Sequence, residues 1–91
     1  MPSEVSSTLG ERGSRYGDFA DNAAISQALE DIMRNSAGFH IMNATQREGL
    51  KAIMQKIARI LNGDPNYADN WHDIQGYARL VEERLPKETK S

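Results

Sequence analysis

The spacing of apolar residues predicts three helices. In residues 18–35, 44–62 and about 67–85, apolar side chains recur every three or four positions, as on one face of an amphipathic helix. No stretch of useful length alternates apolar and polar residues in the way a half-buried strand does, so the sequence predicts an all-α protein. The three apolar stripes consist of Ile25, Leu29, Ile32 and Met33; of Leu50, Ile53, Met54, Ile57, Ile60 and Leu61; and of Tyr67, Trp71, Ile74, Ala78, Val81 and Leu85.

Polar and small residues mark the predicted helix ends. Asp18 or Asp21 can cap the first helix, and Thr45 with Glu48 forms a capping-box pattern at the start of the second. Asn66 is the expected N-cap of the third helix, and Gly63 suits the left-handed conformation that ends many helices. Short connections favour antiparallel neighbours, so we expect an antiparallel bundle of three main helices.

The length of the chain predicts one small domain with a thin core. We expect a flexible arm at residues 1–15, a single helical domain at residues 16–86 and a tail at residues 87–91. A chain of this length buries only about 60–65% of its surface on folding, and its hydrophobic fraction of 38% is low. Phe19 and Leu80 lie off the apolar stripes and add exposed apolar surface. The sequence therefore predicts a homo-oligomer.

Charge and cysteine content argue against several classes of function. A net charge of -2 and a pI near 5.6 argue against binding of nucleic acid through bulk electrostatics. The chain has no cysteine, which removes disulfides and thiolate metal sites and fits a cytoplasmic protein. No apolar run approaches the roughly 20 residues that span a membrane, so no membrane partner is expected.

A polar stripe on the third helix is the main candidate for function. Asn70, Asp73 and Tyr77 stand at i, i+3 and i+7, beside the apolar stripe of the same helix. A polar group at the edge of a core needs a partner. Lys56 and Arg59 on the second helix could supply cations, either to a bound phosphate or to Asp73 itself. The five residues therefore predict either a ligand-binding cleft between two helices or an internal ion pair.

The carboxylates suggest a second kind of site. Asp69 and Asp73 are four residues apart on one helix and could hold Mg²⁺ together with an acid from a neighbouring helix. The simpler interpretation assigns Asp73 to an ion pair, Asp18 to a helix cap, and Glu30 and Glu48 to solvated faces. On that interpretation no cofactor is expected.

Three segments resemble a group of small phage and prophage proteins of unassigned function. These segments are RYGDF at residues 15–19, KIARILNGDP at residues 56–65 and DNWHDIQGYARL at residues 69–80. The group is similar to the all-α nucleoside triphosphate pyrophosphohydrolases of the MazG-like superfamily. The resemblance covers about residues 12–85. It implies a phage or prophage origin, with the host cytoplasm as location, a helical dimer or tetramer, and Mg²⁺-dependent hydrolysis of nucleotides.

The resemblance also implies a set of metal ligands. The superfamily uses a Glu-x-x-Glu pattern on one helix and a Glu-x-x-Asp pattern on another. The second pattern falls on Asn70 and Asp73, so an amide replaces the first carboxylate. Acids for the first pattern would have to come from Glu30, Asp31 and Glu48. With this departure, we expect no catalysis by the superfamily mechanism.

Three hypotheses for function follow from the sequence. We favour a non-catalytic phage-type helical protein that binds a nucleotide, another phosphorylated small molecule or a host protein in the cleft of Lys56, Arg59, Asn70, Asp73 and Tyr77. The first alternative is a divergent Mg²⁺-dependent nucleoside triphosphate pyrophosphohydrolase that uses Asp69 and Asp73. The second alternative is a structural oligomerisation module without a ligand.

Overall fold

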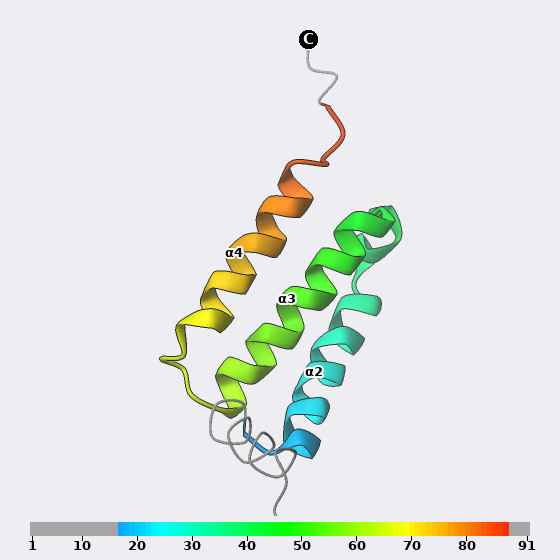
Figure 1. The fold of residues 1–91 in the computed structure, drawn as a ribbon. Helices are drawn as coiled ribbons and strands as arrows, with labels where there is room; N and C mark the ends of the chain where they lie inside the picture. Colours follow the sequence, from blue (N-terminus) through cyan, green and yellow to red (C-terminus); the bar gives the residue numbers. More distant parts are fainter. Residues whose placement is uncertain (1–16, 88–91) are drawn as a thin grey trace, which may run out of the picture.

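The computed structural model describes residues 17–87, which form three α-helices and one short 3-10 helix. In chain order these are α2 (Phe19–Arg34), η1 (Ala37–Ile41), α3 (Ala44–Asn62) and α4 (Ala68–Glu82) (Figure 1). The predicted all-α class is confirmed for the described residues. None of their helices is both long and apolar enough to cross a membrane. The predicted arm at residues 1–15 lies outside the described range, as does the predicted tail beyond residue 87.

The start of α2 is fixed as the sequence predicts and is tied to the end of α3. The Asp18 carboxylate accepts hydrogen bonds from the backbone N–H groups of Ala20 and Asp21, at 3.1 and 3.2 Å. Gly17 has a positive φ of 80°, and a Cβ at this position would overlap the backbone carbonyl of Asn62. The Asn62 side-chain amide donates to the Asp18 carbonyl at 2.9 Å. The turn before α2 therefore rests on the last residue of α3.

The start of α3 differs from the prediction. The capping box is formed by Asn43 and Gln46, whereas Thr45 and Glu48 were expected. Asn43 Oδ1 accepts from the Gln46 N–H, and Gln46 Oε1 accepts from the Asn43 N–H, both at 2.9 Å. Because Asn43 already satisfies the third N–H group of the helix, Thr45 lies inside the first turn and plays no capping role.

The C-cap of α3 is predicted at the right residue but in the wrong conformation, and the predicted N-cap of α4 is wrong. Gly63 ends α3 with φ −132° and ψ −133°, which is not the left-handed conformation, although its N–H still bonds the Arg59 carbonyl at 2.9 Å. Asn66 is not the cap of α4, because its N–H donates to the Asp64 carboxylate at 2.9 Å and closes a turn. The helix consequently begins one residue later, with Tyr67 at the cap position and no side-chain capping bond there.

The three helices form an open layer. α3 lies in the middle, and α2 and α4 pack against its two sides as antiparallel neighbours (Figure 1). Contact between α2 and α4 is marginal at most. The predicted antiparallel order is present, but the helices do not close around a shared core as a bundle would.

Few side chains of this layer are buried, and several of the buried ones are polar or charged. Ala58 is the one fully buried apolar residue within the described range. Ser26 and Glu30, on the side of α2 that faces α3, are 7% and 9% exposed. The prediction of a solvated Glu30 is therefore wrong; its carboxylate lies 3.4 Å from Arg34. Trp71, expected in an apolar stripe, is 51% exposed, and its indole N–H donates to the Pro65 carbonyl at 2.8 Å.

The close approach of α3 and α4 occurs at Gly49. A Cβ on Gly49 would overlap Cγ2 of Val81, so the two helices touch through a glycine on one side and a β-branched side chain on the other. Gly76 on α4 takes part in no such contact, because no atom lies within 4 Å of a Cβ built at that position.

Candidate functional site between α3 and α4

Lys56 and Asp73 form an ion pair between α3 and α4. Lys56 Nζ lies 2.9 Å from Asp73 Oδ2, and the side chains are 15% and 42% exposed. The hydrogen bond from the Lys56 ammonium lowers the pKa of Asp73 below its usual value. Partial burial acts in the opposite direction, and the positive charges of Lys56, His72 and Arg59 add smaller lowering effects. The charge of Asp73 is therefore already balanced by a residue of the same chain.

Asn70 lies one turn before Asp73 and is fully buried. It is 1% exposed and is the largest fully buried side chain of the described residues. Its side-chain N–H₂ group has no hydrogen-bond partner among them. The predicted inward orientation of the polar stripe therefore holds at Asn70, but this amide is sealed inside the helix contact and offers no open surface to a ligand.

The other predicted site residues lie in different places. Tyr77 is 37% exposed and lines a groove further along α3 and α4. Arg59 lines a crevice between α2 and α3, together with Ser26 and Glu30. Asp69 is exposed and accepts a hydrogen bond from the Tyr67 hydroxyl at 2.9 Å. The five predicted ligand-binding residues thus do not line one common cleft, although Asp73 and Tyr77 share a shallow pocket on α4.

The predicted metal ligands have partners of other kinds. Asp69 bonds to Tyr67, and Asp73 bonds to Lys56. Across residues 17–87, no three His, Cys, Asp or Glu side chains gather where they could hold a metal ion.

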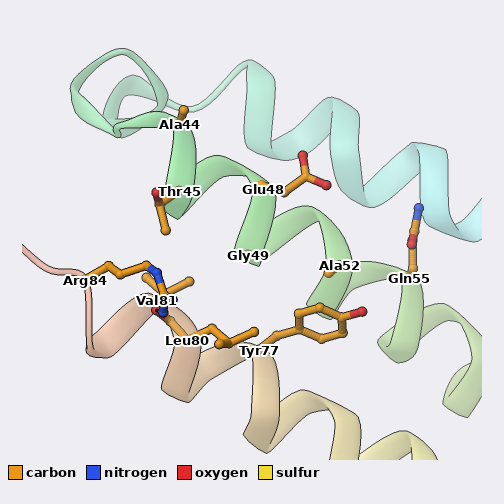
Figure 2. A pocket seen from close by; sticks show the side chains of 10 residues that line it. All are labelled: Ala44, Thr45, Glu48, Gly49, Ala52, Gln55, Tyr77, Leu80, Val81 and Arg84. Atoms are coloured by element: carbon orange, nitrogen blue, oxygen red, sulfur yellow. Dashed lines mark hydrogen bonds between the residues drawn. The ribbon is translucent and has the colours of Figure 1, made fainter.

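A groove between α3 and α4 contains one predicted ligand-binding residue, Tyr77. It has a volume of about 590 Å³, and the small residues Gly49 and Ala52 lie on its α3 side (Figure 2). Tyr77 extends along this surface, and Glu48 points away from it toward α2 (Figure 2). The groove is lined by Ala44, Thr45, Glu48, Gly49, Ala52, Gln55, Tyr77, Leu80, Val81 and Arg84.

The chain was compared with protein families. The model of DUF6378, a domain of unknown function, matches residues 4–85. The chain belongs to the DUF6378 family. No significant match was found among curated proteins or among solved structures.

All the features described above fall within the DUF6378 domain. Sequence reasoning found Tyr77 but missed the groove that it lines, including Thr45 and Arg84. A signal was present, because Gly49 and Ala52 are three residues apart on α3 and leave room on one face of the helix. Whether Tyr77 meets that face depends on the rotation of α4 about its own axis. The spacing of apolar residues along the sequence does not determine this rotation.

Proposed function

We propose that this DUF6378 protein is a non-catalytic helical protein that binds a small ligand with an anionic group, such as a nucleotide or another phosphorylated small molecule. The supporting observation is the groove between α3 and α4. Its volume of about 590 Å³ lies within the range of roughly 300–1,000 Å³ that is typical of small-molecule sites. Its lining combines apolar surface with a few polar side chains, which is the usual composition of such sites.

One end of the groove suits an anionic group. Arg84 lies there; its guanidinium donates a 2.9 Å hydrogen bond to the Leu80 carbonyl and lies 4.0 Å from the Glu83 carboxylate, a longer contact than the 2.9 Å between Lys56 and Asp73. Ala44 and Thr45 from the first turn of α3 line the same groove, and the Thr45 hydroxyl adds a donor. The first N–H groups of a helix have no intrahelical acceptor, and that end carries a partial positive charge. A phosphate at this end would meet donors from both helices.

The rest of the groove suits the body of the ligand. Leu80 and Val81 provide apolar contacts, and Ala52 leaves space beside them (Figure 2). Tyr77 can contribute an aromatic face and a hydroxyl. The proposal therefore keeps Tyr77 from the predicted site but replaces Lys56 with Arg84 as the cation, because Lys56 is already bonded to Asp73.

Binding of anionic ligands with matched variants tests this proposal. Inorganic phosphate and a panel of nucleotides, each with and without Mg²⁺, should include a ligand that raises the thermal midpoint of the protein in the absence of metal. Arg84→Gln should weaken that binding about tenfold or more, since a charge-assisted hydrogen bond is lost. Arg79→Gln is the matched control, because Arg79 is exposed, pairs with Glu83 and does not line the groove.

Two results would refute the proposal. One is the absence of stabilisation by any ligand of the panel. The other is equal affinity of Arg84→Gln and wild type for a ligand that does bind. Release of pyrophosphate from a nucleotide would favour the hydrolase alternative, for which residues 17–87 show no converging acids.

The origin of the protein and a possible host partner are separate hypotheses. A phage or prophage origin, with action in the host cytoplasm, rests on the resemblance of three sequence segments. A host protein as ligand rests on the same resemblance. Expression in a bacterial host and identification of a specific complex that depends on Arg84 would test the second hypothesis.

A further inference from the structure

The side of the layer opposite the ligand groove carries a large apolar surface. It surrounds a second groove of about 820 Å³ between α2, η1 and α3, which meets α4 at Val81, a residue that lines both grooves. None of the residues that line the second groove is charged. At about 100° per residue, Leu50 in this groove and Ala52 in the other point about 160° apart on α3. We call this surface the apolar face and define it by Leu29, Ile32, Met33, Ile41, Leu50 and Ile53.

The strongest hydrophobic stripe of the chain turns toward this face and is only partly covered. Leu50 begins the stripe of α3 and is 42% exposed, and Leu61 ends it at 66%. Ile32 from α2 is 66% exposed, and Ile41 from η1 is 87% exposed. Because α2 and α4 pack on the two sides of α3, they leave the middle of the stripe, Ile53, Met54, Ile57 and Ile60, only half-buried. A helical layer with one apolar face normally packs against a second layer.

We propose that a second copy of this chain covers the apolar face and that the protein is a two-fold symmetric dimer. The first argument concerns charge. Contact between two copies of the same surface places like residues near one another, which is unfavourable for charged residues but not for this uncharged lining. Two copies of the apolar face can therefore pack against each other without repulsion between like charges.

The second argument concerns the core. Ala58 is the one fully buried apolar residue within the described range, which is little for a chain of 91 residues. If the helices need a second layer to be stable, the protein that supplies this layer has to be present whenever the chain is synthesised. A second copy of the chain meets this condition, since it is always produced alongside the first.

The third argument concerns area. α3 has 19 residues and is about 28 Å long at 1.5 Å per residue. The apolar face spans two neighbouring helices, α2 and α3, which at roughly 9 Å spacing give a width of about 18 Å. The face therefore measures on the order of 500 Å² per partner, or about 1,000 Å² in total, which is the size that a specific interface has to reach.

Light scattering of the full-length protein tests the proposal. Wild type should have twice the chain mass of 10.2 kDa at micromolar concentration. Ile32→Glu should raise the dimer dissociation constant about a hundredfold, because an unpaired carboxylate would be buried at the interface. Phe19→Glu is the matched control and should leave the dimer intact. Phe19 is also apolar and on α2, and it is 84% exposed, but it does not line this groove.

Urea unfolding keeps the proposal testable where a variant does not fold. The unfolding midpoint of a dimer rises with protein concentration, so wild type and Phe19→Glu should show this dependence. A wild-type mass of one chain throughout the micromolar range, with a midpoint independent of concentration, would overturn the proposal. So would a dimer that survives Ile32→Glu but dissociates in Phe19→Glu. The ligand experiment with Arg84→Gln concerns the opposite face and is decided independently.

Discussion

Substitution of alanine for Gly49 should reveal how tightly α3 and α4 are packed. Glycine inside a helix costs about 1 kcal/mol relative to alanine, so alanine would stabilise an isolated helix at this position. The new methyl group would overlap Cγ2 of Val81, and Cβ of Val81 lies 3.7 Å away. Val81 is β-branched and has little rotational freedom in a helix, so α4 itself would have to move.

The expected magnitude follows from comparison with Gly76. Gly76→Ala brings the same gain in helix propensity, and no atom lies within 4 Å of the new Cβ. It should therefore raise the free energy of unfolding by about 1 kcal/mol. At Gly49, overpacking costs about 1–3 kcal/mol against that gain. We expect Gly49→Ala to be less stable than Gly76→Ala by about 1–3 kcal/mol.

Urea denaturation monitored by far-UV circular dichroism measures this difference, with all variants at one protein concentration. The Val81→Ala background supplies a further control, because removal of Cγ2 eliminates the overlap. In that background Gly49→Ala should recover its gain in helix propensity. Equal stabilisation by Gly49→Ala and Gly76→Ala in the wild-type background would show that α3 and α4 are not in close contact at this point.

Three further predictions concern the ion pair, the helix cap and the buried amide. Lys56→Met should raise the pKa of Asp73 toward its ordinary value, as measured by NMR titration of the carboxyl group. Because that pKa is lowered in the folded protein, the contribution of the pair to stability is present above the unfolded pKa of about 3.9 and is lost as pH falls through the folded value. Asn43→Ala should lower the free energy of unfolding by about 0.5–2 kcal/mol, whereas Thr45→Ala should leave it nearly unchanged; the reverse order in urea denaturation would contradict the observed capping box. Asn70→Ala should destabilise by about 1–3 kcal/mol through loss of buried packing, and an unchanged urea midpoint would show that α4 does not depend on this side chain.

Local patterns were sufficient to locate the helices. The period of the apolar residues predicted all three, and Asp18 marked the start of α2 because an aspartate before a helical pattern satisfies free N–H groups wherever it occurs. The N-cap of α3 was predicted at the wrong residue. Asn43 and Thr45 stand two residues apart, both can cap, and the difference between them depends on the path of the preceding chain, which the sequence does not give.

The pairing of Lys56 with Asp73 was one of two interpretations that the sequence left open. Spacing placed both residues at the edge of an apolar stripe, where opposite charges on neighbouring helices can meet. Whether they meet depends on the relative rotation and translation of α3 and α4. Val81 and Gly49 set that relation through their contact, and neither residue was considered in this role from the sequence.

The sequence by itself determined the all-α class, the approximate extent of each helix and the inward position of Asn70, because these depend on interactions between residues close in the chain or on one helix face. Only the tertiary structure decided that the helices form an open layer, that Glu30 is buried while Ile32 is exposed, and that Arg84 and Tyr77 share a groove. Periodicity identifies the apolar side of a helix, but it does not identify the neighbour against which that side packs.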